Sequence, residues 1–278
     1  MARVISVVNQ KGGTGKTTSA INISACLSGM GYRTLVVDME PQANTTLYLG
    51  IDPLSLEMSM YEVLLREQVS LSEITLTTNI KNLHLAPAQV SLSNIDINLA
   101  DKPHKQYRLK EKLDRVRPKY DYILIDCPPS LSLLPLNALT ASDEVIIPLQ
   151  ADYLSLEGLK QLKCSLDKTR EELNPSLSIL GILFTMVDKR SKMAKYSMSL
   201  VREHFGDKVF GPIIRVCSKF NEAPIAGKSI IEYAPMSRGA EDYKDVTKEI
   251  ILRGGVLSKS GLFPMVLHNR IQNFLDKI

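Results

Sequence analysis

The sequence predicts an α/β fold, in which a mostly parallel, twisted sheet of about seven to eight strands carries helices on both faces. Three observations lead to this class. Short β-branched apolar runs alternate with longer amphipathic stretches along the chain. The runs are apolar enough to be buried on both faces, as strands of a covered parallel sheet are. The 278 residues, of which 44% are hydrophobic, suffice to bury a large core.

The predicted elements follow one another in a regular order. Strands are expected at residues 4–9, 33–38, 83–87, 122–127, 144–149, 180–187 and 209–214. Helices are expected at residues 16–30, 105–115, 133–141, 156–173, 191–205 and 238–253. Breakers such as Gly31, Pro118 and Asn174-Pro175 separate these elements. We therefore expect one domain over residues 1–253, followed by a linker and a C-terminal amphipathic helix over residues 254–278.

Composition excludes several classes of protein. Lys and Arg total 34 against 30 Asp and Glu, so the formal charge of +4 is too small for a histone-like polycation, and any basic surface must be local. The longest apolar runs fall short of the roughly 18–20 residues that span a membrane. The N-terminus shows no secretory signal, so we expect a cytoplasmic protein. The four cysteines are scattered without a CxxC pair, which argues against a zinc site or a disulfide framework.

A phosphate-binding loop follows the first predicted strand. The segment KGGTGKTT, residues 11–18, leads from this strand directly into a helix. Its glycines let backbone N–H groups converge on phosphate oxygens, Lys16 can reach the β- and γ-phosphates, and the Thr17 hydroxyl can bind Mg²⁺. Gln10 stands where the usual P-loop pattern has glycine, and Lys11 adds a second lysine. The GxGxxG spacing of a Rossmann site is absent.

Acidic side chains end two further predicted strands. Asp126 closes the run ILID and precedes a proline-broken loop, as the Walker B carboxylate of P-loop enzymes does. Asp38 and Glu40 end another strand, where alternation would place both on one side of an extended segment and Pro41 forces an exit loop. These acids lie on the same edge of the predicted sheet, where they can orient a metal ion and a water molecule.

The motifs as a set resemble those of the Soj/ParA family of chromosome- and plasmid-partitioning ATPases. The resembling segments are NQKGGTGKTT, VVDMEPQ, DYILIDCPPS, ALTASD, EGL, NEAP and SRGAE, which span residues 1–253. The resemblance implies a P-loop fold with a deviant Walker A motif and a Mg²⁺-dependent ATPase that converts ATP to ADP and phosphate. It also implies a homodimer around two ATP molecules that binds DNA non-specifically on the nucleoid. A ParB/Spo0J-like centromere-binding partner would stimulate hydrolysis and release the dimer.

The resemblance also assigns roles to residues. Lys11 corresponds to the signature lysine that reaches across the dimer to the phosphates of the other subunit. With Lys16, Asp38 and Glu40 it makes up the expected catalytic set. Glu40 stands where the family usually has aspartate. A glutamate keeps the charge but adds a methylene, so it can either still orient the attacking water or misplace it by about 1 Å and slow turnover. The expected metal ligands are Thr17 and Asp126. The expected nucleotide-binding residues are Lys11, Gly12, Gly13, Thr14, Gly15, Lys16, Thr17 and Thr18.

Positive charge gathers in one segment of the chain. Residues 186–228 contain nine Lys or Arg and four acids, a net charge of +5 that exceeds the +4 of the whole chain. Such a segment suits sequence-independent contacts with DNA phosphates, and no helix-turn-helix is evident. Arg190 and Lys219 correspond to positions that the family uses for DNA contact, although arginine is more usual at the second.

Two other functions fit the same P-loop. A MinD-like positioning ATPase would bind a membrane through the C-terminal segment, whose apolar helical face would comprise Leu267, Ile271, Phe274, Leu275 and Ile278. This segment has few basic residues, so we expect no stable membrane association. A metabolic ligase or reductase of this class is disfavoured because the cysteines and histidines are isolated. The cargo is left open, since positioners of chromosomes, plasmids and other assemblies share these motifs.

Overall fold

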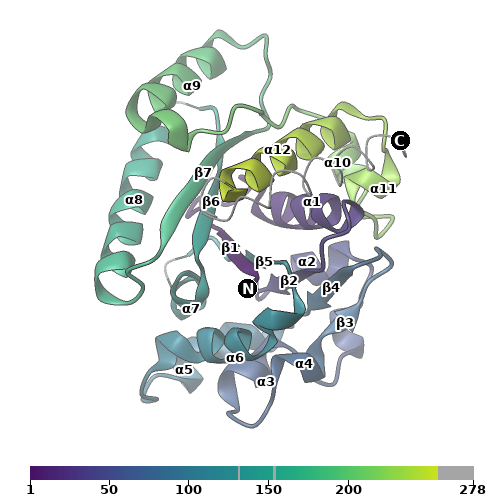
Figure 1. Cartoon of the computed structure of the whole chain (residues 1–278), viewed down its shortest axis with the longest axis vertical. Coiled ribbons are helices and arrows are strands. Elements are labelled where there is room, and N and C mark those ends of the chain that lie inside the picture. Colours follow the sequence, from purple (N-terminus) through teal and green to yellow (C-terminus); the bar gives the residue numbers. More distant parts are fainter. Residues whose placement is uncertain (131, 153–154, 256–278) are drawn as a thin grey trace.

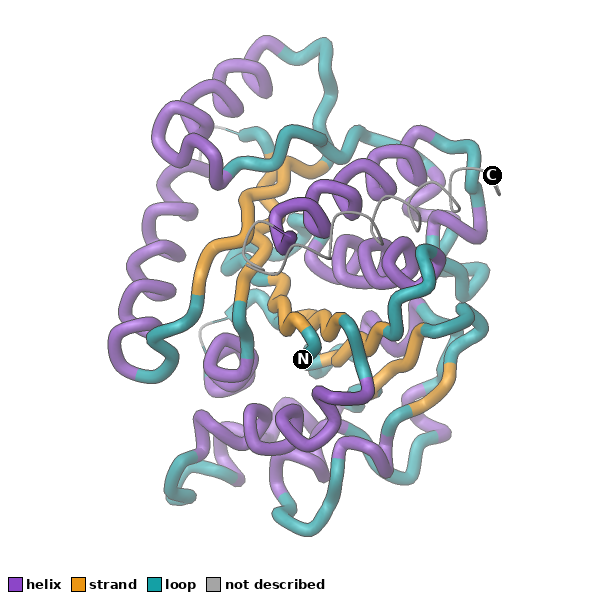
Figure 2. The backbone as a smooth tube through the Cα atoms, viewed as in Figure 1, coloured by secondary structure: helices purple, strands orange, loops and turns teal. Residues whose placement is uncertain are grey.

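The computed structural model describes residues 1–130, 132–152 and 155–255, which form three layers (Figure 1). A seven-stranded sheet runs through the middle, and helices cover both of its faces (Figure 2). The strand order is β3-β4-β2-β5-β1-β6-β7, and every pair is parallel except β3 with β4. The predicted fold class is therefore confirmed. The predicted C-terminal helix lies outside the described residues.

The elements have the following bounds. The strands are β1 Arg3–Val7, β2 Thr34–Asp38, β3 Leu76–Thr77, β4 Leu83–Ala86, β5 Tyr122–Asp126, β6 Glu144–Gln150 and β7 Ser178–Thr185. The helices of the first half are α1 Lys16–Gly29, α2 Asn44–Tyr48, α3 Met60–Leu65, α4 Leu71–Ile74, α5 Ile95–Asn98 and α6 Arg108–Val116. Those of the second half are α7 Leu133–Ala141, α8 Ser155–Glu172, α9 Lys192–Phe205, α10 Lys219–Glu222, α11 Ile230–Tyr233 and α12 Arg238–Gly255.

The strand predicted at residues 209–214 is wrong. This segment follows the outer edge of β7, where the N–H groups of Phe210 and Ile214 donate to carbonyl groups of β7. Pro212 occupies the position between them and has no N–H, so the ladder is interrupted and only isolated bridges form on either side. The seventh strand is instead β3, whose two residues are too few to produce a recognisable apolar run.

The helix predicted at residues 105–115 is shifted toward the C-terminus. Residues Lys105–Tyr107 form a 3-10 turn, and the α-helix begins only at Arg108. Helix α12 continues through Gly255, so the first two residues of the predicted linker are helical, and the rest of that segment lies outside the described residues. Within the described ranges, no helix combines the length and the apolar character needed to traverse a lipid bilayer.

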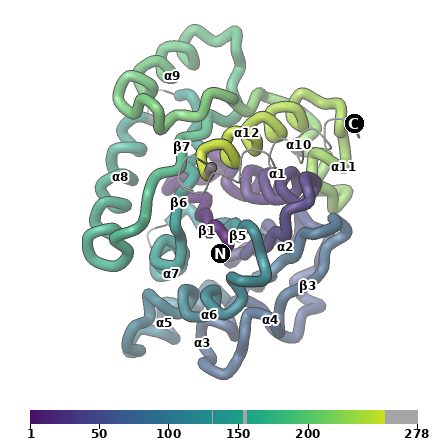
Figure 3. Tube along the Cα trace, in the orientation of Figure 1, coloured from purple at the N-terminus to yellow at the C-terminus, as the bar shows by residue number. Residues whose placement is uncertain are grey.

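Two apolar cores hold the layers together. One lies between the sheet and helices α3 to α9, and the other lies between the sheet and helices α1, α2 and α10 to α12. On the second face, α1 and α12 pack side by side although they come from opposite ends of the chain (Figure 3). Every residue of β2 and β5 is buried, as a sheet covered on both sides requires.

The parallel order brings three strand ends together. Val7 at the end of β1 is in register with Asp126 at the end of β5, and Asp126 is in register with Asp38 at the end of β2. The chain leaves β1 through the glycine-rich loop, and β1 has neighbours on both sides that come later in the chain. In open α/β sheets such a position at the carboxyl ends of the strands is where ligands bind.

Candidate functional site

The loop between β1 and α1 has the backbone geometry of a phosphate cradle. Gly13 and Gly15 have φ angles of +72° and +83°, conformations that glycine adopts readily. Gly15 is the N-cap of α1 and provides no side-chain cap, and the first turn of α1 contains no acidic residue. The N–H groups at this helix N-terminus, with the positive end of the helix dipole, therefore suit an anion.

Polar side chains at the ends of β6 and β7 fix the loop. The Gln150 Nε2 atom donates to the Gly13 carbonyl at 2.9 Å, and the Thr185 hydroxyl donates to the Thr14 carbonyl at 2.8 Å. Sequence reasoning missed both anchors. The available signal was that each is a polar residue ending an otherwise apolar strand, as Asp126 ends β5.

The two lysines of the loop lie in different environments. Lys16 is buried, and its ammonium group donates to the Lys11 carbonyl at 3.2 Å. Burial lowers the pKa of Lys16, while the nearby Asp126 carboxylate acts in the opposite direction. The Lys11 ammonium is half-exposed and pairs with Asp152 at 2.5 Å, just beyond β6. Beside it, a Cβ atom on Gly12 would meet nothing within 4 Å.

Asp126 lies at the centre of the site and is fully buried. Its Oδ2 atom accepts hydrogen bonds from the hydroxyl groups of Thr17 at 2.7 Å and Thr45 at 2.8 Å. Its Oδ1 atom is buried without a hydrogen-bond partner among the described residues. Burial raises the pKa of Asp126 to about 6, although the two hydroxyl groups oppose this shift.

The pair of Thr17 and Asp126 fits a magnesium ion. A hydroxyl oxygen and a carboxylate with an unused buried oxygen are the hard donors that Mg²⁺ prefers. The part of the chain that the structure describes contains no group of three His, Cys, Asp or Glu side chains able to hold a metal ion. Mg²⁺ usually takes one or two protein ligands and completes its shell with water and phosphate.

Asp38 is also fully buried, beside Asp126 in the sheet. Its Oδ2 atom accepts from the Thr46 N–H at 2.9 Å and from the Thr46 hydroxyl at 2.7 Å, and its Oδ1 atom accepts from the Glu40 N–H at 3.1 Å. Burial and the neighbouring Asp126 charge raise the pKa of Asp38 to about 7. Through these three hydrogen bonds, Asp38 fixes the turn that leads into α2.

Glu40 differs from Asp38 in its surroundings. We expected both acids on one side of an extended segment, but β2 ends at Asp38 and Glu40 is half-buried in the following turn. Its Oε1 atom accepts from the Gln42 N–H at 3.4 Å. The Glu40 charge still acts on the pKa values of Lys16 and Asp126, which places the carboxylate near the loop.

Arg190 and Lys219 lie outside this site. The Arg190 side chain is 91% exposed and pairs with Asp188 at 3.0 Å in the turn before α9. Lys219 begins α10 and pairs with Glu222 at 2.8 Å. Most basic side chains of residues 186–228 are exposed, namely Lys189, Arg190, Lys192, Lys195, Arg202, Lys208 and Lys228.

These features define a P-loop nucleoside triphosphatase. A glycine-rich loop connects a central parallel strand to a helix, and a threonine of that helix contacts a buried acid on the neighbouring strand. A family model described as an AAA domain matches residues 2–179. The chain is 43% identical over 254 residues to the sporulation initiation inhibitor protein Soj of Bacillus subtilis, covering 91% of this chain and all of that protein. This chain belongs to the Soj/ParA family of partitioning ATPases.

Two further proteins show the range of the similarity. The chromosome partitioning protein ParA of Caulobacter vibrioides is 39% identical over 253 residues, which cover 90% of this chain and 94% of that protein. Among solved structures, a protein described as cobyrinic acid a,c-diamide synthase from Mycobacterium smegmatis, with a bound ATP analogue and magnesium, is 32% identical. It superposes with a TM-score of 0.83 over 95% of this chain and all of the other.

Proposed function

We propose that this chain is a Mg²⁺-dependent ATPase that segregates chromosomal or plasmid DNA. Its ATP-bound form is a homodimer that binds DNA without sequence specificity on the nucleoid, and a ParB/Spo0J-like partner stimulates the hydrolysis that releases it. The observation that supports this most strongly is the contact of Thr17 with Asp126, whose second oxygen is buried and unused, beside the glycine loop. The family to which the chain belongs supplies the context.

The residues of the site have distinct tasks in this proposal. The N–H groups of residues 12–18 and the Lys16 ammonium hold the phosphates of ATP. Thr17 and Asp126 hold Mg²⁺, which neutralises phosphate charge when it is bound. The burial of Lys16 strengthens its electrostatic interaction with an anion, because water screens it less there. The Lys11 carbonyl that now accepts from Lys16 gives way to a phosphate oxygen as the hydrogen-bond acceptor.

Glu40 and Lys11 act on the reaction. The Glu40 carboxylate accepts a long hydrogen bond from the Gln42 N–H and carries a charge that acts on Asp126, so we assign to it the orientation of the attacking water. Lys11 exchanges its exposed partner Asp152 for the phosphates of the second subunit, where it stabilises charge as an arginine finger does. Asp38 holds the turn that carries Glu40, through the Glu40 N–H group.

The DNA-binding surface would comprise Arg190, Lys219 and the exposed basic residues around them. Arg190 and Lys219 are paired with exposed acids in the free subunit, and such pairs contribute little stability. They therefore exchange readily for DNA phosphates. Dimerisation doubles the number of phosphate contacts, which multiplies the counterions released on binding.

We favour partitioning over a metabolic reaction and over membrane binding. Relatives whose names state chromosome partitioning are 39–43% identical, whereas the neighbour named for a synthase is 32% identical. Co-sedimentation of the full chain with plasmid DNA and with anionic liposomes, each with Mg²⁺ and either ATP or ADP, tests this choice. We expect the protein to pellet with DNA when ATP is present. Pelleting with liposomes alone, or with neither, would contradict the proposal.

A further inference from the structure

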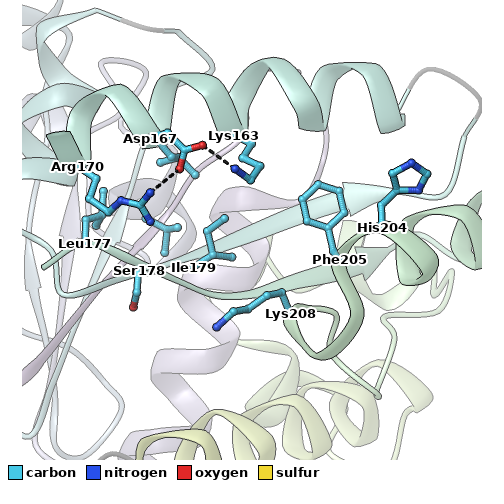
Figure 4. A pocket seen from close by; sticks show the side chains of 11 residues that line it. Lys163, Asp167, Arg170, Leu177, Ser178, Ile179, His204, Phe205 and Lys208 are labelled. Atoms are coloured by element: carbon cyan, nitrogen blue, oxygen red, sulfur yellow. Dashed lines mark hydrogen bonds and ion pairs between the residues drawn. The ribbon is translucent and has the colours of Figure 1, made fainter. Parts of the chain in front are cut away.

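A hollow lies at the opposite end of the strands from the phosphate-binding loop. It has a volume of about 370 Å³ and lies between α8, the end of α9 and the start of β7 (Figure 4). Ser178 and Ile179, the first residues of β7, form part of its wall. We call it the α8–α9 pocket. None of the residues assigned to nucleotide or metal lines it, and of the Lys and Arg residues in the basic segment 186–228 only Lys208 does.

The floor of the α8–α9 pocket is apolar. Val145, Leu166 and Leu177 are buried beneath it, while Ile179 and Phe205 are only half-buried. The half-buried pair offers aliphatic and aromatic surface that a ligand can cover, with a gain of roughly 25 cal/mol per Å² of apolar area removed from water.

The rim of the pocket is basic. Lys163 and Arg170 from α8 lie on either side of Asp167 and both pair with it, at 2.6 Å and 3.2 Å (Figure 4). The Lys208 side chain is exposed and has no hydrogen-bond or ion-pair partner among the described residues. His204 also lines the pocket, next to Phe205, and its Nδ1 atom lies 2.9 Å from the Leu200 carbonyl oxygen. Three permanent cations therefore face one carboxylate, and this excess of positive charge favours an anionic ligand.

We propose that the α8–α9 pocket binds a short acidic segment of a partner protein, in which an aliphatic or aromatic side chain stands between carboxylates. The apolar side chain packs on Ile179 and Phe205. The carboxylates reach Lys208 on one side and Arg170 on the other, where charge-assisted hydrogen bonds form. The inference does not depend on the proposed partitioning function, because the pocket lies at the other end of the sheet from the nucleotide site and shares only Lys208 with the basic segment 186–228.

Other occupants fit the pocket less well. A small molecule would be enclosed on most sides, whereas most of the charged rim side chains here are exposed. Duplex DNA would not use an apolar floor, and Asp167 would repel its phosphates. Residues 256–278 carry three Lys or Arg and one acid, so their charge does not complement the rim.

Peptide binding to the full chain tests the inference. The probe is a fluorescent peptide of sequence EDFDE, measured by anisotropy, with QNFNQ and EDGDE as control peptides. We expect EDFDE to bind best, because QNFNQ lacks the charge and EDGDE lacks the apolar anchor. K208E should weaken EDFDE binding about tenfold or more. K168E, which changes the net charge equally at an exposed site on α8 outside the pocket, should leave it unchanged.

Four outcomes would overturn the inference. Equal binding of the three peptides would show that the pocket does not select an apolar side chain between carboxylates. Equal weakening of EDFDE binding by K208E and K168E would show a non-specific effect of charge. If duplex DNA displaced the peptide, and K208E abolished this competition, the pocket would be identified as a phosphate-binding surface. The wild-type chain could instead fail to bind the peptide and self-associate in sedimentation. If K208E abolished that self-association, the pocket would be assigned to a second copy of this chain.

Discussion

The buried carboxylates Asp38 and Asp126 are neighbours across two strand ends and repel each other when both are ionised. Burial raises the pKa of both, and the charge of Asp126 adds to the shift of Asp38, whose pKa rises to about 7. The nucleotide-free protein therefore binds more protons at this site than the unfolded chain does between about pH 4 and 7. A bound cation would remove the repulsion, which explains why such a pair is tolerated beside a metal site.

The sign of the pH dependence follows from these shifts. Because the folded state binds more protons than the unfolded state between about pH 4 and 7, the carboxylate pair lowers the free energy of unfolding as pH rises through this window. D38N removes one of the two charges. We expect its stability relative to wild type to improve by about 1–3 kcal/mol between pH 5 and 8, measured by urea unfolding without nucleotide or Mg²⁺. D96N, an exposed change on α5, is the control. Parallel pH curves for wild type and D38N would refute the coupling.

The Glu40 side chain separates binding from turnover. E40A should leave ATP-dependent dimerisation and DNA binding intact but lower single-turnover hydrolysis by about a hundredfold or more, because a carboxylate that orients water acts in the transition state. E40D should retain activity, and it should be faster than wild type if the glutamate places the water poorly. Hydrolysis unchanged in E40A would show that another group orients the water, and Asp38 would be the first to test.

Only part of the site could be predicted from single residues. The loop residues Lys16 and Thr17 are contiguous with the glycines, and Asp126 ends a strand whose neighbours fix its position. Thr45 and Thr46 were missed, although their hydroxyl groups donate to Asp126 and Asp38. Their role arises from the way α2 folds back on the strand ends, and no spacing in the sequence specifies that contact.

Secondary-structure elements also differ in how well the sequence predicts them. Long periodic segments such as α8 and α12 were predicted almost to their ends, since apolar periodicity extends over several turns. The short helices α3, α4 and α5 gave too few turns for a periodic signal, although α3 begins with a capping box of Ser59 and Glu62. Residues 209–214 at the edge of the sheet were predicted as a strand. Composition does not show at which positions β7 needs a hydrogen-bond donor, and so the effect of Pro212 was missed.

The loop carrying Lys11 is held by the end of β6 in the free subunit. D152N removes the ion pair with Lys11 and should lower the ATP concentration needed for half-dimerisation by about two- to threefold, because an exposed pair contributes about 0.5 kcal/mol. Analytical ultracentrifugation across an ATP titration measures the shift. D121N, which removes a comparably exposed carboxylate paired with Arg33, should cause none. A requirement for more ATP in D152N would mean that Asp152 supports the dimer instead.

In the proposed function, DNA binding depends on how charge is distributed over the surface of the dimer. The ATP dimer presents the basic segment twice, so R190A or K219A should each lower the slope of log affinity against log salt by about 1–2 and weaken binding at about 100 mM salt. ATP-dependent dimerisation should be unaffected. K110A, an exposed change on α6, should not alter the slope. DNA binding that is equally strong without ATP, or insensitive to salt, would contradict the proposed surface.

In the proposed function, ATP joins two subunits across the glycine loop, and a substitution at Gly12 can show whether the two loops meet. A Cβ at Gly12 meets no atom within 4 Å in the single subunit, so G12V should fold and bind ATP normally. The same side chain would obstruct the approach of a second loop. Light scattering with Mg²⁺ and ATP should give twice the 30.9 kDa chain mass for wild type, and the mass of one chain for wild type with ADP and for G12V with ATP. A G12V protein that dimerises with ATP as wild type does, or a wild-type protein that stays monomeric with ATP, would contradict the account.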